Sequence, residues 1–316
     1  MILRVDRWLA ELPPPSAPDP EGARVVQELM GGKFGEMSTF LNYTFQSFNF
    51  RERQAARPFF DLISNIAAEE FGHIELVAAA INSMLTDDKS IKDELAMAKS
   101  PLLGLPSLAG NPHHYVNGGK GALPQDSRGL PWTGDNVFSS GDLLSDLTHN
   151  YFLETGARSG KLRVYEAVDH PAARALTGYL LVRGGVHQVA YARAVENLTG
   201  ADLTKLFPGP RVPSDAIKES KPYIEKGDHR RLYRFSPDDY RELAAVFNGN
   251  HPETGEPLEV VDEDPSARPL PQDLPAQNDV FAPGYSTEEV REIADKLRKQ
   301  AGLPRAVTGD VAHPSK

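Results

Sequence analysis

The residues best suited to chemistry in this sequence are carboxylates and imidazoles that fall on otherwise apolar helical faces. Glu70 and His73 form a Glu-x-x-His motif within Ala-Ala-Glu-Glu-Phe-Gly-His. Residues three apart on a helix project from one face, so this pair can hold a single metal ion. The motif alone carries little weight, because Glu-x-x-His often arises by chance on a solvated helical face.

Three further residues of the same kinds stand on predicted inner faces. Glu36 lies seven residues from apolar positions on both sides, and Glu154 and His187 each follow a leucine by seven. A lone histidine on an apolar face is usually a packed core residue, but an unpaired buried carboxylate is costly. Four helices that each place such a group near mid-length predict one metal centre, made by Glu36, Glu70, His73, Glu154 and His187.

The number of predicted ligands bears on the chemistry. A ferritin-like di-iron site takes one Glu from each of two helices and Glu-x-x-His from the other two, but here Gly184 stands where the second motif would have its Glu. Three carboxylates and two imidazoles leave a pair of divalent ions cationic by one, with open positions for substrate. The glycines of the last helix either leave space beside His187 or allow close helix packing; they are Gly178, Gly184 and Gly185.

Two polar residues are candidates for proton transfer or hydrogen bonding at this centre. Lys161 lies one heptad after Glu154, so it is either a proton donor beside the metals or a lysine that extends outward to water. Tyr43 lies one heptad after Glu36, where it either bonds a ligating carboxylate or packs in the core.

Four long amphipathic segments are predicted to position these residues, at about 21–50, 54–85, 140–168 and 171–200. Pro171 suits the first turn of the last helix, and Gly200 suits its end. Residues 86–140 are rich in Gly, Pro, Asn and Ser, with a short helix expected at 90–98. One long crossover between the second and third helices is typical of the ferritin-like bundle. We therefore predict an all-α fold with this bundle over residues 21–200.

The segments on either side of the bundle are predicted to differ from it. Residues 1–20 contain five prolines and are expected to be extended. Residues 201–316 are expected to form a C-terminal extension or oligomerisation arm, with a short helix at 237–247. Seven prolines in 251–284 cannot build a core of their own, so this stretch is either disordered or laid on another subunit. Ser286 and Glu289 form a capping box that predicts a last helix over 286–300.

Composition excludes several classes of protein. The 316 residues include 34 basic and 44 acidic side chains, a net charge of −10, and no basic stripe that would suit nucleic acid. The absence of cysteine excludes disulfides, thiolate zinc sites and iron–sulfur clusters, and it suits contact with oxidants. No stretch approaches the ~20 apolar residues of a membrane span, and the N-terminus does not read as a signal peptide. A cytoplasmic location is expected.

Four sequence blocks, in this order, resemble the manganese catalases, and the resemblance spans roughly residues 1–300. They are Gly-Gly-Lys-Phe-Gly-Glu ending at Glu36, Ala-Ala-Glu-Glu-Phe-Gly-His ending at His73, Phe-Leu-Glu-Thr-Gly-Ala-Arg around Glu154, and Tyr-Leu-Leu-Val-Arg-Gly-Gly-Val-His ending at His187. The resemblance implies two manganese ions bridged by Glu70, with Glu36 and His73 on one ion and Glu154 and His187 on the other. It also implies a homohexamer whose proline-rich tails wrap neighbouring subunits.

Members of that family differ around the cluster. Some have Arg just before the third-helix Glu and a Glu three residues before the last His, where this chain has Leu153 and Gly184. This chain is more similar to the members with an inner lysine, which Lys161 matches. The resemblance therefore assigns the ligands and leaves the outer proton relay open.

Some members also bind calcium near the second helix, so the resemblance allows a calcium site here. Asp61 matches one of its ligands, Asn65 stands where an aspartate is expected, and Ser236 is the candidate third ligand.

The function that the resemblance implies is catalase: disproportionation of hydrogen peroxide to water and oxygen, with the cluster cycling between Mn(II)Mn(II) and Mn(III)Mn(III). Lys161 or bridging solvent would handle the protons. One alternative is a di-iron ferroxidase or oxygen-activating oxidase, because Glu and His accept iron as well as manganese. The other is a metal-storage shell or a structural oligomer with a vestigial site. The missing Glu at Gly184 disfavours the first, and the long C-terminal arm disfavours the second.

Overall fold

The structure is a computed structural model that describes residues 7–86, 113–207, 216–276 and 284–304. Its long helices are α1 (Pro20–Gly31), α2 (Glu36–Phe48), α3 (Arg57–Leu85), α6 (Leu143–Ala167), α7 (Pro171–Thr199) and α11 (Thr287–Gln300). The shorter elements are η1 (His113–Asn117), η2 (Gly134–Asn136), α8 (Leu203–Leu206), α9 (Lys221–Glu225), η4 (Asp228–Arg230), β1 (Arg231–Arg234), α10 (Leu243–Val246), β2 (Glu259–Asp262) and η5 (Pro265–Ala267).

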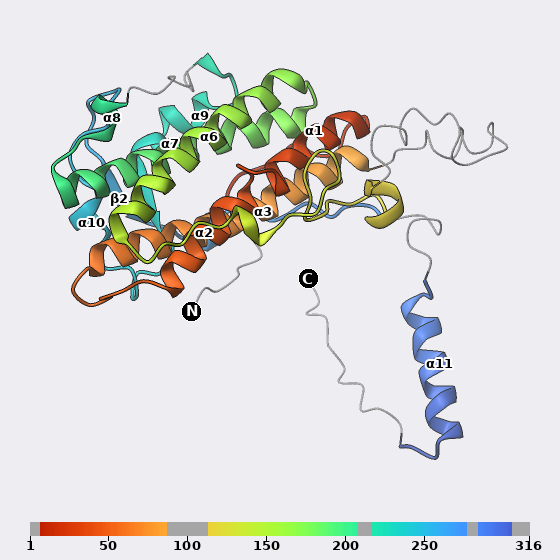
Figure 1. Cartoon of the computed structure of the whole chain (residues 1–316). Coiled ribbons are helices and arrows are strands. Elements are labelled where there is room, and N and C mark those ends of the chain that lie inside the picture. Colours follow the sequence, from red (N-terminus) through yellow and green to blue (C-terminus); the bar gives the residue numbers. More distant parts are fainter. Residues whose placement is uncertain (1–6, 87–112, 208–215, 277–283, 305–316) are drawn as a thin grey trace. The chain divides into compact units, whose positions relative to one another are not determined.

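Helices α1, α2, α3, α6 and α7 pack against one another as a bundle (Figure 1). Helix α6 lies along α7 and α2 lies along α3, and the two pairs meet through contacts of α3 with α7 and of α2 with α6. Apolar side chains from α2, α3, α6 and α7 share one core cluster, among them Tyr43, Leu62, Leu147 and Tyr191. The expectation of a mostly helical fold is confirmed.

The predicted first helix is wrong in one respect: it is two helices. Gly32 has an extended backbone after α1, and Gly35 is the extended N-cap of α2. A side chain at Gly32 would meet the Glu28 carbonyl oxygen at 2.4 Å, so only glycine allows this close turn. The break makes Glu36 the first residue of α2, where the helix macrodipole favours a carboxylate.

The third and fourth bundle helices begin and end close to where the sequence predicts. Asp142 caps α6 by accepting a hydrogen bond from the Ser145 backbone N–H. The turn into α7 ends at Pro171, and α7 is closed by Gly200 in the left-handed region at φ 79°. These caps set the register of α6 and α7, and so the level at which their polar side chains meet.

The connection between α3 and α6 is described from residue 113 onward, and it runs along α1 and α2. Gln27 donates to the carbonyls of Leu123 and Gln125, and Asn42 donates to that of Asn136. These buried amides satisfy backbone groups of a segment with little secondary structure of its own. The short helix expected at 90–98 lies outside the described residues.

The C-terminal region corrects the all-α expectation, because β1 and β2 form a small parallel sheet. The register pairs Arg231 with Glu259 and Arg234 with Asp262. Parallel strands need a long connection, which the segment between them supplies. The helix expected at 237–247 is only the four-residue α10, whereas the last helix and its capping box are confirmed in α11.

The chain falls into two compact units, residues 1–275 and 276–316. In the first unit the C-terminal region packs on the bundle, since α10 contacts α3 and α7 and β1 contacts α7. The Trp8 backbone N–H also donates to the Pro269 carbonyl, which joins the N-terminal segment to the proline-rich stretch. None of the helices among the described residues has the length and apolar character needed to span a bilayer.

Candidate dimetal centre

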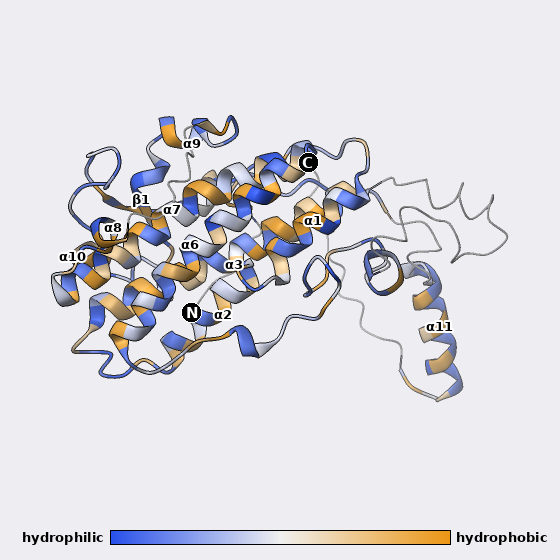
Figure 2. Ribbon diagram, turned by 45° about the horizontal axis from the view of Figure 1, so that its top comes forward, coloured by the Kyte–Doolittle hydropathy of each residue, from blue (hydrophilic) through white to orange (hydrophobic). Residues whose placement is uncertain are grey.

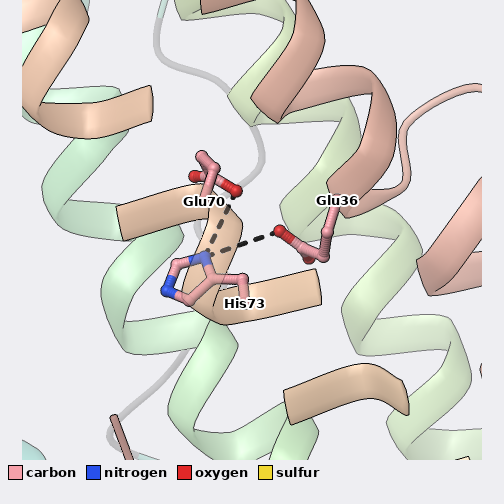
Figure 3. Close-up of side chains that lie close together, drawn as sticks. All are labelled: Glu36, Glu70 and His73. Atoms are coloured by element: carbon pink, nitrogen blue, oxygen red, sulfur yellow. Dashed lines mark hydrogen bonds and ion pairs between the residues drawn. The ribbon is translucent and has the colours of Figure 1, made fainter. Parts of the chain in front are cut away.

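Two groups of carboxylate and imidazole side chains that could hold a metal ion lie buried inside the bundle and share one residue. Glu36, Glu70 and His73 form the first group, and Glu70, Glu154 and His187 form the second, with ligand atoms of each group within 4.8 Å of one another. Figure 3 shows the first group, in which His73 points between the carboxylates of Glu36 and Glu70. All five predicted ligands are therefore brought together, and each is at most 1% exposed.

Both imidazoles turn Nδ1 toward the carboxylates of the candidate ligands. His73 Nδ1 lies 3.2 Å from Glu70 Oε2 and 3.5 Å from Glu36 Oε2. His187 Nδ1 lies 2.7 Å from Glu70 Oε1 and 3.5 Å from Glu154 Oε1. Each oxygen of Glu70 thus faces one imidazole, and the two rings stack with centroids 5.6 Å apart. A carboxylate in this position can bridge two cations.

The two candidates for outer roles also reach the cluster. Lys161 is 1% exposed and places Nζ 2.9 Å from Glu36 Oε1, so it does not extend outward to water. The Tyr43 hydroxyl donates a 2.7 Å hydrogen bond to Glu154 Oε1. Thr39 was not predicted, and its hydroxyl donates to Glu70 Oε2 at 2.8 Å.

Glu69 is the main functional candidate that sequence reasoning missed. Its carboxylate lies behind both imidazoles, with Oε2 3.1 Å from His187 Nε2 and Oε1 3.7 Å from His73 Nε2. Arg183 holds it through Nε to Oε1 at 2.5 Å and Nη2 to Oε2 at 3.1 Å. A carboxylate on the far nitrogen of a metal-binding histidine fixes its tautomer and ring orientation. The signal available in the sequence was Arg183, a charged residue one helical turn before His187.

Arg183 is itself held by the C-terminal region. Its Nη1 donates to the carbonyls of Asp228 and Arg231 at 2.8 Å each, and its guanidinium lies 4.0 Å from the ring centroid of Tyr233. The side chain is fully buried. The segment from η4 to β1 therefore reaches the imidazoles through Arg183 and Glu69.

The ionisation of the buried groups follows from these contacts. Burial alone would lower the pKa of His73, but the charge of Glu70 and hydrogen bonds to the neighbouring carboxylates raise it to about 10. Burial alone would raise the pKa of Glu69, but Arg183 and His187 bring that pKa well below its usual range. Burial similarly opposes the charge on Lys161, yet Glu36 and Glu154 raise its pKa. The cluster is thus built to attract cations, and a metal would take the place of the imidazole protons.

Buried oxygens that lack ordinary partners fit a metal site. Within the described part of the chain, Glu154 Oε2 has no hydrogen-bond partner, and neither has Glu36 Oε2, whereas Glu36 Oε1 lies in the ion pair with Lys161. An unsatisfied buried carboxylate oxygen is costly unless something coordinates it. Carboxylate oxygens and imidazole nitrogens are ligands that manganese and iron both accept.

Comparison with known proteins shows the family to which this chain belongs. The family described as manganese containing catalase matches residues 1–303. This chain belongs to the manganese catalase family. It is therefore an enzyme of that family, and membership implies a manganese cofactor, which the donor set fits.

Individual relatives agree with this assignment. The manganese catalase of Bacillus subtilis is 33% identical over 265 residues, which are 83% of this chain and 91% of that protein. The manganese catalase of Lactiplantibacillus plantarum is 29% identical over 184 residues, which are 58% of this chain and 67% of that protein. The crystal structure of wild-type KatB, a manganese catalase from Anabaena, matches with a TM-score of 0.53 and 23% identity, over 75% of this chain and 92% of that one. That likeness supports the ferritin-like fold.

The three glycines of α7 serve two different purposes. A Cβ at Gly178 would meet Glu219 Cβ at 2.5 Å. Gly178 therefore allows the segment before α9 to pack closely on α7, and the close neighbour is not another bundle helix. Gly184 and Gly185 instead face Arg158, and a Cβ at Gly184 would lie 3.5 Å from Glu154 Oε2. At the position of the missing fourth-helix Glu, Gly184 thus leaves room for Arg158 next to Glu154.

The three calcium candidates have other partners in the structure. Asp61 accepts a 2.6 Å hydrogen bond from Arg57, and its other oxygen accepts one from the Glu242 backbone N–H. Asn65 donates to the Tyr233 carbonyl and accepts from the Phe235 backbone N–H. The Ser236 hydroxyl donates to Asp239. Asn65 thus attaches the β1 region to α3, and Asp61 attaches the start of α10 to α3; a calcium ion there stays a prediction.

Proposed function

We propose that this chain disproportionates hydrogen peroxide to water and oxygen at a centre of two manganese ions. The observation that carries the proposal is the pair of overlapping ligand groups that share Glu70 inside a manganese catalase bundle. In this proposal Glu70 would be the ligand common to both ions. Glu36 and His73 would hold one ion, and Glu154 and His187 would hold the other.

When bound, the manganese pair supplies two one-electron centres that alternate between Mn(II)Mn(II) and Mn(III)Mn(III), so each half-reaction moves two electrons without releasing a radical. The chain's part is to hold charge and exclude water. Three ligating carboxylates offset most of the charge of the pair, and the ligands are at most 1% exposed. Glu69 and Arg183 cancel each other's charge while they orient both imidazoles.

Lys161 is proposed as the proton carrier of the site. Its ammonium lies 2.9 Å from Glu36 Oε1, and its pKa is raised, so it stays charged beside the ligand. It can hold a proton close to the place where an oxygen atom of the cleaved peroxide would leave as water. Tyr43 is proposed to orient Glu154, since its hydroxyl donates to the oxygen nearest His187.

The alternative functions differ in metal and in product. A di-iron ferroxidase or oxidase would use the same donor types, but Gly184 lacks the expected carboxylate and Arg158 takes the adjacent space. A storage shell would bind metal without turning over peroxide. Elemental analysis of the purified protein, together with oxygen evolution after addition of peroxide, distinguishes all three.

The direct test of the proposal is Glu70→Ala. We expect this variant to lose manganese and oxygen evolution together, because both ligand groups lose their shared member. The matched control is Glu166→Ala, an exposed glutamate of α6, which should keep both. Wild-type turnover of peroxide by the Glu70→Ala protein would rule out the proposed bridge.

Three further expectations stay predictions. A homohexamer with wrapped tails is tested by the mass of the assembly in solution. A calcium ion at Asp61, Asn65 and Ser236 is tested by calcium analysis before and after chelation. The cytoplasmic location is tested by cell fractionation.

A further inference from the structure

The last helix, α11, has an apolar stripe that is exposed in the described part of its unit, residues 284–304. Val290, Ile293 and Leu297 are 51%, 38% and 59% exposed. Spacings of three and four residues place them on one face, with Ala294 between them. Figure 2 shows hydrophobic bands on successive turns of α11. Such a stripe on a helix whose other positions are largely charged is typical of one that packs on a partner.

The helix is well defined by local signals but too short to stand alone. Ser286 and Glu289 form a complete capping box, in which the Ser286 hydroxyl accepts from the Glu289 N–H and the Glu289 carboxylate accepts from the Ser286 N–H. The 14 residues of α11 span about 21 Å. Isolated helices of this length are marginal in water, so packing of the apolar face must supply stability.

The charges of α11 are divided between its two halves. Residues 287–293 have three acidic side chains against one basic, a net charge of −2. Residues 294–300 have three basic side chains against one acidic, a net charge of +2. This division suits the macrodipole of a single helix. It also makes the helix complementary to a second copy of itself that runs in the opposite direction, and self-repelling in a parallel pair in register.

The edge of the stripe agrees with the antiparallel arrangement. Glu289 and Lys296 are seven residues apart and border the same edge. In an antiparallel pair each edge meets the same edge of the other helix, so Glu289 lies near Lys296 of the second copy. A two-fold axis between Ile293 and Ala294 also places Val290 opposite Leu297 of the second copy. In this one arrangement, apolar side chains face apolar side chains and acidic side chains lie near basic ones.

We propose that α11 pairs antiparallel with α11 of a second copy of this chain, through Val290, Ile293, Ala294 and Leu297. The surface is separate from the manganese ligands and does not depend on the proposed catalase activity. In the homohexamer expected from the family resemblance, tethering through the rest of the subunits would raise the effective concentration of the helices, which would offset the small size of the contact.

The test uses the absence of cysteine from the chain. Single cysteines introduced on the stripe form disulfides only where two copies bring them together. Ala294→Cys, next to the two-fold axis, is expected to cross-link to itself under mild oxidation. Thr287→Cys and Ala301→Cys lie at opposite ends, so neither should cross-link alone, and the two should cross-link when co-expressed. Glu292→Cys, on the opposite face, is the control and should stay monomeric on a denaturing gel.

Charge reversal on α11 is tested in the Ala294→Cys background. Glu288→Lys, Glu289→Lys and Glu292→Lys together make α11 uniformly basic in net charge, and Lys296→Glu, Arg298→Glu and Lys299→Glu together make it acidic. Each triple variant should lose the cross-link when expressed alone and regain it when the two are co-expressed.

Two results would overturn the proposal. Absence of the Ala294→Cys cross-link in the full-length protein would mean that α11 packs on its own chain or on another partner. Self-linking of both Thr287→Cys and Ala301→Cys would mean that the pair is parallel.

Discussion

Replacing Arg183 by Met tests the link between the C-terminal region and the metal ligands. Arg183 is fully buried, and its guanidinium binds both oxygens of Glu69 and two backbone carbonyls. Methionine keeps much of the volume and removes the charge. Breaking a buried ion pair from one side costs about 3–5 kcal/mol, because the other charge stays buried without a partner. This is a large part of the ~5–15 kcal/mol by which a folded protein is stable.

The measurement is urea denaturation of the chelator-treated protein, with a double-mutant cycle. We expect Arg183→Met to lower the free energy of unfolding by about 3–5 kcal/mol. The double variant Arg183→Met with Glu69→Gln removes both charges, so it should lose less than the sum of the single variants. Arg234→Met is the matched control, since its ion pair with Asp262 is solvent-exposed and contributes little.

The same variants report on the metal centre. Loss of a carboxylate behind a metal-binding histidine typically lowers metal affinity by about 10–100-fold, so Glu69→Gln should bind manganese correspondingly more weakly. A buried ion pair that stabilises the fold is contradicted if Arg183→Met unfolds at the wild-type urea concentration, or if the double variant loses as much stability as both single variants combined.

Three further perturbations have defined outcomes. Gly178→Ala should destabilise the protein by about 1–3 kcal/mol, because a Cβ there would lie 2.5 Å from Glu219 Cβ, whereas Gly160→Ala, with open space around it, should stabilise by up to about 1 kcal/mol; thermal unfolding compares the two. Burial lowers the pKa of His114 to about 4, below the ~6.5 of an unfolded chain, so the unfolded state takes up the proton first and stability should fall as pH drops from about 6.5 to 4; His114→Gln should flatten that slope in urea titrations. Tyr43→Phe removes the hydrogen bond to Glu154 and should weaken manganese binding by roughly tenfold, measured by metal competition, while retention of wild-type affinity would assign Tyr43 to packing alone.

The local patterns that predicted the site did so because helix periodicity is a short-range property. Glu70 and His73 are three apart on one helix, so their common face follows from the sequence. The convergence of Glu36, Glu154 and His187 required a further assumption, that the helices place these residues at the same height in the bundle. The structure brings these side chains together.

The break between α1 and α2 shows where periodicity misleads. The apolar spacing continues from Leu29 to Tyr43 and predicts one helix. The glycines at 31, 32 and 35 interrupt it, because their backbones approach carbonyls of the preceding turn and of Gln125 too closely for any side chain. The contact with Gln125 comes from a segment 94 residues further on, which no window along the sequence contains.

By itself, the sequence determined α3, α6, α7 and α11 and the candidate metal-binding side chains, because these depend on residue type and on spacing within a few turns. Only the tertiary structure decided which charged side chains contact the Nε2 atoms of the two imidazoles. Glu69 is adjacent to Glu70 yet faces another direction, and its partner Arg183 lies 114 residues away. The parallel pairing of β1 with β2 has the same character. Such contacts depend on the relative placement of elements distant in sequence, which follows from packing the whole core rather than from any local pattern.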